Sequence, residues 1–492
     1  MDILEKIKSF LFENKGAKQT VFKNTFWSGF AEAINKLIKL FLIIFIARLI
    51  NADEYGKFNF AMSFAGMFGI IADLGVSSII AREFAKDREN ERYFSELFTL
   101  KFILASISLV ACVVVSIFSG FPLLVNKIIW VWALINFTNA VFYLVPLVLH
   151  ARQRAEYGSL LSILQTISTA AFVYFLISRT PGSFSLAIAY FLGSFIPLAA
   201  FAWVFSRRVY SFWFKIDFNL WRKYLEMSWP LAILAFFSTI YTSTDTIILG
   251  YFKLFDQVGY YNAALKIMTV ITIPAGIISS SFFPMLCKKI GEGASELQKI
   301  WNLQISCLIV LILPIFAGGY FLAPKIIDYV YYQGYAQSVE GLRILLFVVL
   351  IIVFSQPFTQ MLTILDRQKK LLVVSAITAI LNIPLDYYLI IKTGYRYTGA
   401  AWATVITMAA AIILFYFFVK QEKNFIEPVN GAIVLVFLSS LVSSLLMILI
   451  LKIPWIYSLN IFLIIFVGAI FYSVILFIQI LLLSKTSFKN CF

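Results

Sequence analysis

The sequence is poor in charged residues, in cysteine and in histidine. Charged side chains make up 13% of its 492 residues, and it has four cysteines and one histidine. The cysteines show no paired spacing, so neither a disulfide framework nor a zinc site is indicated: Cys112, Cys287, Cys307 and Cys491. The single histidine, His150, gives no support to a catalytic mechanism based on histidine. We therefore predict no catalytic group, no metal site and no resident cofactor.

The sequence also lacks any long polar segment. The longest stretch between apolar segments, about residues 321–340, is far too short for a separate domain, and we expect it to form an amphipathic outer helix. The first apolar segment is too long for a cleavable signal and lacks a small-residue cleavage pattern. A membrane glycosyltransferase or polysaccharide polymerase usually needs a sizeable extramembrane region, which this chain lacks. An enzyme of this kind is therefore the least favoured of the three functions that we consider.

What the chain has instead is apolar surface. Its hydrophobic share is 61%, against about 45–50% in soluble domains, and its mean hydropathy is +0.90. Windows of bilayer length predict about 14 membrane-spanning helices in an all-α protein. The segments are 24–50, 58–80, 97–118, 128–149, 159–178, 185–206, 228–250, 260–286, 300–320, 341–364, 371–391, 399–419, 429–451 and 456–484.

The basic residues alternate with these segments. With the N-terminus on the cytoplasmic side, the inner segments carry 26 of the 40 Lys and Arg, the outer loops nine and the spans five. Cytoplasmic loops accumulate basic residues, so we predict that both termini are cytoplasmic. The net charge of +15 is spread over helix ends and not over one soluble face, so a nucleic-acid partner is not expected.

The chain is predicted to divide into two six-helix lobes and two trailing helices. A short internal repeat supports this division. In each half, a long predicted helix is joined to a return helix through a turn with an acidic residue and a glycine, in the segments ARLINADEYGKFNFAMSF and ILGYFKLFDQVGYYNAALKI. The predicted segments are a cytoplasmic interfacial helix at 1–23, an N-lobe at 24–206, a cytoplasmic interfacial linker at 207–227, a C-lobe at 228–419 and the trailing helices with the tail at 420–492.

Several predicted spans carry polar stripes. In the first span, Glu32, Lys36 and Lys39 recur at helical spacing, and Glu32 and Lys36 are placed to form an i,i+4 ion pair. Ionisable groups in hydrocarbon are costly and often functional, which predicts a shared aqueous cavity. Neutral polar residues can instead be hydrogen bonds between helices without a function. The polar residues predicted to line the cavity are Glu32, Asn136, Asn139, Asn262, Gln356 and Asn382.

Four motifs resemble one family over nearly the whole chain: ARLINADEYGKFNFAMSF, IADLGVSSIIAREFA, TDTIILGYFKLFDQVGYYNAALKI and YRYTGAAWATVI. They are similar to the polysaccharide-transporter branch of the multidrug/oligosaccharidyl-lipid/polysaccharide (MOP) exporter superfamily. That resemblance implies two pseudo-symmetric six-helix lobes plus two C-terminal helices, and alternating access. It also implies flipping of polyprenyl-pyrophosphate-linked oligosaccharides, with a cavity lined by cationic residues. The matching positions here are Lys36, Lys39, Arg48, Arg82 and Lys266.

Our main hypothesis is therefore a flippase in the cell membrane. Lysine and arginine would shield the pyrophosphate, and coupling to Na⁺ or H⁺ would use an acidic group within a span. The candidates for that group are Asp245, Glu32 and Asp386. Its expected partners are the lipid-linked oligosaccharide, membrane lipids and glycan-assembly enzymes. The second interpretation is a cation-coupled multidrug antiporter of the same superfamily, which would favour an acidic chamber over one rich in lysine.

Overall fold

The chain folds almost wholly into helices. The computed structural model describes residues 13–14, 16–87, 93–208, 213–332, 334–422, 426–427 and 429–483. No strand occurs in these residues, which confirms the predicted all-α class. The chain divides into two compact units, unit 1 (Met1–Val258) and unit 2 (Gly259–Phe492).

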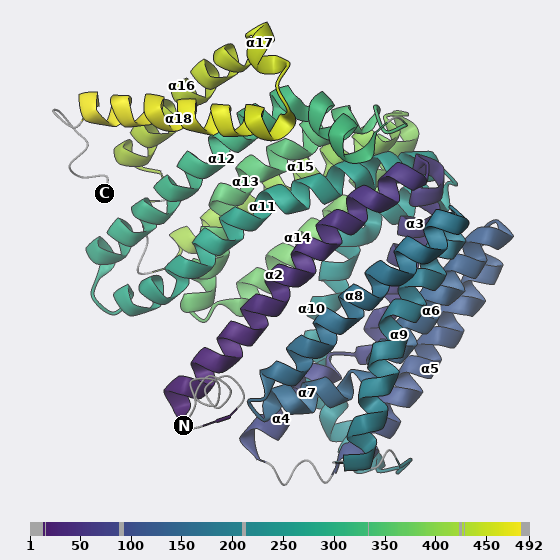
Figure 1. The fold of residues 1–492 in the computed structure, drawn as a ribbon. Helices are drawn as coiled ribbons and strands as arrows, with labels where there is room; N and C mark the ends of the chain where they lie inside the picture. The colour runs from purple at the N-terminus through teal and green to yellow at the C-terminus, as the bar shows by residue number, and fades with distance from the viewer. Residues whose placement is uncertain are drawn as a thin grey trace, which may run out of the picture. The chain divides into compact units, whose positions relative to one another are not determined.

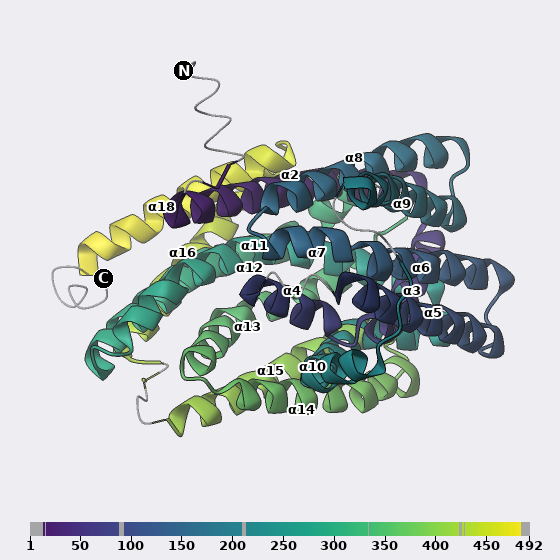
Figure 2. The same ribbon diagram turned by 90° about the horizontal axis from the view of Figure 1, so that it is seen from below.

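Unit 1 is built around two groups of neighbouring helices. Helix α8 packs against both α2 and α9, and α3 packs against α5, α6 and α10 (Figures 1 and 2). A buried apolar core joins α4, α5, α7 and the first turns of α10. The helices of unit 1 are α2 (Ala17–Leu49), α3 (Ala52–Asp73), α4 (Val76–Lys86), α5 (Phe94–Phe118), α6 (Leu123–Phe142), α7 (Leu144–Ala151), α8 (Ala155–Arg179), α9 (Ser183–Arg208) and α10 (Phe218–Tyr251).

Unit 2 is built around α12, which packs against α13 and α16, while α13 also packs against α15. The last helix, α18, contacts α16 and α12. Helix α11 (Phe255–Lys289) begins just before the unit boundary. The others are α12 (Ala294–Tyr331), α13 (Ser338–Ile364), α14 (Gln368–Tyr387), the π-helical turn η2 (Tyr388–Lys392), α15 (Arg396–Lys420), α16 (Gly431–Leu451), α17 (Pro454–Tyr457) and α18 (Ile461–Leu483).

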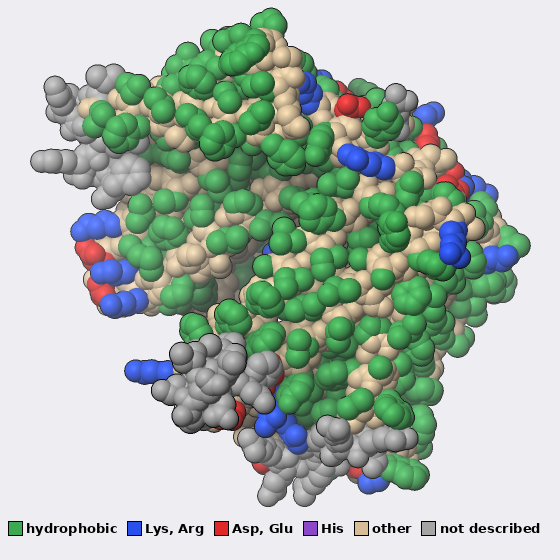
Figure 3. All heavy atoms as spheres, viewed as in Figure 1, with side chains coloured by type: hydrophobic (Ala, Val, Ile, Leu, Met, Phe, Trp, Pro, Cys, Tyr) green, Lys and Arg blue, Asp and Glu red, His purple; other side chains and the backbone are tan. Residues whose placement is uncertain are grey.

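The helices suit a membrane. Among the described residues, 12 helices are long and apolar enough to span a bilayer, or 13 if the bent pair of α3 and α4 is one span. Helix α2 is also long enough, with 33 residues, but carries several charged side chains. Hydrophobic side chains cover most of the face in Figure 3. Such a large apolar surface is unfavourable in water, so the protein is a multi-pass membrane protein. Its number of candidate spans is close to the predicted 14.

The predicted second span is bent. Helices α3 and α4 meet at an angle of 42°. Leu74 and Gly75 between them have φ values of 45° and 73°, in the left-handed region, which ends one helix and starts the next. A Cβ at Gly75 would lie 2.9 Å from the Cβ of Leu231 on α10, so a larger residue would not fit the contact between the break and α10.

Three predicted boundaries differ from the structure. Helix α10 begins at Phe218, inside the predicted linker, because Asp217 caps it by accepting a hydrogen bond from the Leu220 N–H at 3.0 Å. The amphipathic outer helix predicted near 321–340 is wrong, because most of that stretch continues α12 to Tyr331. Residues 1–12 and 15 of the predicted interfacial helix lie outside the described residues, and α2 already begins at Ala17.

The unit boundary also falls one helix later than the predicted linker. Helix α10, the predicted first helix of the C-lobe, packs with α3, α4 and α5. The two-lobe division drawn from the sequence stays a prediction.

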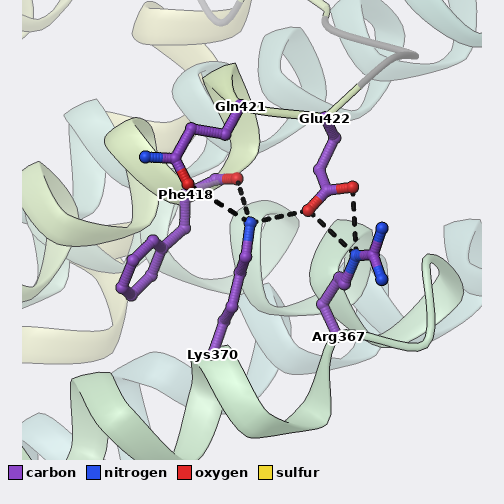
Figure 4. A network of polar contacts seen from close by, with 5 residues as sticks. All are labelled: Arg367, Lys370, Phe418, Gln421 and Glu422. Carbon is purple, nitrogen blue, oxygen red and sulfur yellow. Dashed lines mark hydrogen bonds and ion pairs between the residues drawn. The ribbon is translucent and has the colours of Figure 1, made fainter.

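A polar network joins the ends of α14 and α15 in unit 2 (Figure 4). Both carboxylate oxygens of Glu422 lie 3.0 Å from the Arg367 Nε, and one lies 2.7 Å from the Lys370 Nζ. Lys370 also donates to the Phe418 carbonyl at 3.3 Å. The hydrogen bond from Lys370 is the main reason that the pKa of Glu422 lies below its ordinary value. The network ties the two helix ends together, and Glu422 at its centre lies beyond the end of α15.

Candidate functional site

The polar stripe of α2 faces a cavity within unit 1. The cavity has a volume of about 420 Å³ and is bounded by α2, the junction of α6 with α7, and α8. Ligand sites typically enclose about 300–1,000 Å³, so this one is at the small end of that range. Its lining residues are Ser28, Ala31, Glu32, Asn35, Lys36, Lys39, Tyr143, Pro146, Leu147, His150, Ala155, Gly158, Ser159 and Ser162.

The α2 wall of the cavity is cationic. Lys36 and Glu32 form the predicted i,i+4 ion pair, at 2.7 Å, and their side chains are 49% and 66% exposed. Lys39, one turn further on, is exposed and has no ion pair among the described residues. Two lysines against one glutamate leave a net positive wall, with Lys39 available to an anion.

The opposite wall offers further hydrogen-bonding groups. Tyr143 lies between α6 and α7, His150 lies near the end of α7, and Ser159 and Ser162 lie on α8. Asn35 joins the two walls, because its Nδ2 donates to the Ser162 Oγ at 3.1 Å. The cavity therefore combines cations with hydroxyl, amide and imidazole groups, as a ligand with both phosphate and sugar parts would need.

A polar cluster around one buried ion pair holds the first turns of α2 against α8, beside the cavity. Lys23 and Glu156 form an ion pair at 2.8 Å with side chains only 0% and 2% exposed. Lys23 also donates to the Asn14 Oδ1 at 2.7 Å, and Asn24 donates to the Gln153 Oε1 at 2.8 Å. We call these five residues the α2–α8 clamp. Because Ala155 lines the cavity and its N–H is bonded to the Asn24 Oδ1 at 3.3 Å, the clamp positions that wall.

The structure brings together two of the predicted cations. Lys36 and Lys39 share the cavity, whereas Arg48, in the last turn of α2, and Arg82, on α4, do not line it. Both arginines are exposed, and the Arg82 Nε lies 3.2 Å from a carboxylate oxygen of Glu83. Lys266 lies half-buried on α11 in unit 2. The roles of these three residues in a cavity stay predictions.

Asn136 and Lys101 in unit 1 bond to groups on neighbouring helices. Asn136 donates to the Ala65 carbonyl at 2.9 Å, which joins α6 to α3, and Asn139 is half-buried outside the cavity lining. Buried Lys101 forms an ion pair with Asp73 and donates to the Ser77 Oγ at 2.8 Å, which fixes the break between α3 and α4. These contacts are the kind of bonding between helices that needs no transport role.

In unit 2 the predicted polar residues are mostly buried. Asn262, Asn382 and Asp386 are 3%, 1% and 0% exposed, and Gln356 is half-buried on α13. Neither amide atom of Asn382 has a hydrogen-bond partner among the described residues. Asn382 and Asp386 lie one turn apart on α14, whereas Asp245, also buried, belongs to unit 1. An unsatisfied buried amide is costly and therefore marks a candidate ligand site.

The sequence interpretation missed several residues that matter to these sites. Asn35, Ser159 and Ser162 line the unit 1 cavity but were not selected, and His150, which was given no role, lines it too. Asn35 is adjacent to Lys36, so a helical wheel that included both edges of the stripe would have found it.

Unit 2 also holds an apolar groove. It has a volume of about 560 Å³ and is lined by residues of α11, α12, α16 and α18. Gly318, Gly319 and Gly468 contribute to its walls, and a Cβ at each would lie 3.3–3.4 Å from a neighbouring side chain, so the helices pack closely there. The groove suits an apolar chain better than a polar ligand.

Comparison with known proteins identifies the family of this chain. The family model described as "Polysaccharide biosynthesis protein" matches residues 21–290, and the MatE model matches residues 230–388. The probable low-salt glycan biosynthesis flippase Agl15 of Haloferax volcanii is 22% identical over 384 residues, which are 76% of this chain and 78% of that protein.

Two kinds of solved structure share the fold. The lipid II flippase MurJ in its inward closed conformation has a TM-score of 0.71 at 16% identity, covering 93% of this chain and 98% of its own. A multidrug resistance MATE family transporter of the MOP superfamily, in an inward-facing conformation, has a TM-score of 0.63 at 18% identity, covering 78% and 93%. The resemblance found in the sequence motifs is thus confirmed. Since the first model matches more than half of the chain, the protein belongs to the polysaccharide biosynthesis protein family.

Proposed function

We propose that the protein moves a polyprenyl-pyrophosphate-linked oligosaccharide from the cytoplasmic to the outer leaflet by alternating access, for surface polysaccharide or glycoprotein assembly. The observation that carries the proposal is the pair of lysines, Lys36 and Lys39, lining a cavity in a membrane-spanning unit. Family membership and the similarity to a probable glycan biosynthesis flippase support the same substrate class.

Physical chemistry explains why such a cavity suits this substrate. A pyrophosphate that leaves the aqueous phase loses hydration, and nearby ammonium groups replace it with charge-assisted hydrogen bonds. Lys39 offers three N–H donors without a competing carboxylate, and Lys36 adds a second charge that Glu32 partly neutralises. The hydroxyl and amide groups on the facing wall suit sugar hydroxyls.

The apolar part of the substrate needs a different surface. The groove lined by α11, α12, α16 and α18 has room for a segment of polyprenyl chain. Burying apolar carbon in a protein groove instead of lipid gains little hydrophobic free energy, so the groove would guide the chain more than bind it tightly.

Ion coupling is a further part of the proposal. Asp386 and the unsatisfied amide of Asn382 offer oxygen ligands that Na⁺ prefers, while Asp245 and Glu32 are alternative proton carriers. A carboxylate that binds the ion in one conformation and releases it in the other would couple the gradient to transport.

We further propose that the protein resides in the cell membrane with both termini cytoplasmic, as the distribution of Lys and Arg favours. There it would receive its substrate from glycan-assembly enzymes and would itself catalyse no bond change.

The alternative is a cation-coupled multidrug antiporter, which the MatE match over residues 230–388 favours. A cavity for cationic drugs would place acidic groups in excess, whereas the unit 1 cavity has more lysine than glutamate. Drug-resistance tests in a host that lacks its own efflux pumps separate the two functions. Purified protein tested for sugar transfer addresses the enzyme alternative.

The direct test is flipping of a short-chain polyprenyl-pyrophosphoryl sugar in proteoliposomes. We expect Lys39→Ala to slow flipping about tenfold to hundredfold, because a hydrogen bond to a charged group contributes roughly 1.5–3 kcal/mol. Lys452→Ala, which removes an exposed lysine at the end of α16, is the matched control and should leave the rate unchanged. Flipping at the wild-type rate in both Lys36→Ala and Lys39→Ala would contradict the proposal. Repeating the assay with imposed Na⁺ and H⁺ gradients tests the coupling.

A further inference from the structure

The orientation of one amide in the unit 1 cavity is fixed by its neighbours. Ser162 Oγ donates its single proton to the Ser159 carbonyl at 2.8 Å, so it can only accept from Asn35. The Asn35 Nδ2 supplies that hydrogen bond at 3.1 Å. If the Asn35 amide were turned by 180°, its Oδ1 would face the Ser162 Oγ, which has no proton left to donate. The α8 hydroxyl therefore determines which amide atom remains for a ligand.

The remaining atom is an acceptor without a partner. The Asn35 Oδ1 is buried and makes no hydrogen bond to any of the described residues. A buried acceptor left unpaired is destabilising, and a donor brought by a ligand would remove that cost. Because Oδ1 is covered in this conformation, pairing with a ligand requires the atoms that cover it to move while the hydrogen bond from Asn35 to Ser162 stays in place.

The position of this acceptor sets what it can recognise. Asn35 lines the same cavity as Lys36 and Lys39, which are suited to a pyrophosphate. Phosphate oxygens at neutral pH are mainly acceptors and pair poorly with Oδ1, whereas a sugar hydroxyl or an acetamido N–H donates to it. At about 420 Å³ the cavity suits the linkage region, a pyrophosphate with its first sugar, and not a whole oligosaccharide.

We propose that Asn35 is a specificity-determining residue that distinguishes a glycan-bearing carrier lipid from the bare polyprenyl pyrophosphate. This inference rests on the proposed flippase function. The lysines would bind the pyrophosphate of either lipid, and the acceptor at Asn35 would favour the lipid whose next group is a hydrogen-bond donor. Selection of this kind uses an unfavourable contact with the wrong ligand as well as a favourable one with the right ligand.

The test compares two probes that share a lipid and a pyrophosphate: farnesyl pyrophosphate and farnesyl-pyrophosphoryl-N-acetylglucosamine. Their dissociation constants are measured with the full-length protein in nanodiscs. We expect the wild type to bind the sugar-bearing probe about tenfold to hundredfold more tightly, the range expected for one buried acceptor gaining or lacking a partner. Asn35→Leu should bring this ratio close to one by weakening the sugar-bearing probe alone. Asn302→Leu, the same change at a half-buried site on α12 in unit 2 that lines neither the cavity nor the apolar groove, should keep the ratio.

A second variant addresses the orientation of the amide without removing it. In Ser162→Ala no hydroxyl fixes Asn35, so the amide can turn and present Nδ2 to phosphate. We expect farnesyl pyrophosphate to bind this variant more tightly than the wild type, which lowers the ratio. An unchanged ratio in both variants would refute the inference, as would equal weakening of both probes.

The same measurements separate this inference from the function on which it rests. If Lys39→Ala weakens both probes while Asn35→Leu changes neither, the cationic cavity stands and the inference fails. If the wild type binds neither probe, or if Lys39→Ala affects neither, the proposed use of this cavity fails and the inference fails with it.

Discussion

The α2–α8 clamp gives a prediction with a definite magnitude. Glu156→Ala would leave the Lys23 ammonium without its carboxylate partner. The Lys23 side chain is 0% exposed, so water could not replace that partner. Removing one member of a buried ion pair typically costs about 3–5 kcal/mol, because the remaining charge loses its compensation. Its remaining hydrogen bond, to the exposed Asn14, would offset only part of that cost.

Unfolding of the purified protein in detergent measures this effect. A unit of this size shifts its midpoint by about 2–4 °C per kcal/mol, so Glu156→Ala should lower the midpoint by at least about 6 °C. The double variant Lys23→Met with Glu156→Leu replaces both charges by apolar groups and should recover most of the loss, since such replacements are often neutral or stabilising. A double variant no more stable than Glu156→Ala would refute the reasoning, because the cost would then not come from an unpaired buried charge.

Two further predictions concern other parts of the fold. The pKa of Glu422 lies below its ordinary value of 4.5, so its ion pairs stabilise the protein fully above that pH and are lost as the pH falls through the lowered pKa. Glu422→Gln should therefore flatten the loss of thermal stability below about pH 5, and an identical acid profile in the variant would contradict this. Gly193→Ala should destabilise the contact between α8 and α9 by about 1–3 kcal/mol or more, because its Cβ would lie 2.3 Å from the Thr169 Cα, whereas Gly66→Ala has open space and should be neutral or stabilising in the same melting assay.

The membrane class and most of the helices could be predicted from the sequence. Burial in lipid requires long apolar runs, and hydropathy detects these wherever they occur, so nearly every predicted span coincides with a helix. Helix ends were less accurate. The start of α10 depends on a side-chain cap at Asp217, and the end of α12 lies in an amphipathic stretch that hydropathy does not follow.

The candidate site was predicted only in part. The pairing of Glu32 with Lys36 follows from local helical spacing and is present. Lys101, in contrast, has an aspartate partner 28 positions away in the chain, which local spacing could not reveal. The clamp between Lys23 and Glu156 joins residues even further apart, so neither ion pair was predicted.

The sequence by itself determined that this chain spans a bilayer and that basic residues occur at alternate helix ends. It also determined that lysines lie within an otherwise apolar helix. Those properties depend on composition and on spacing within one helix. Only the tertiary structure decided that Lys36 and Lys39 share a cavity with Asn35 and Ser162, whereas Arg48 and Arg82 do not. Which faces of distant helices meet is set by the packing of side chains far apart in the chain, and no local pattern records that choice.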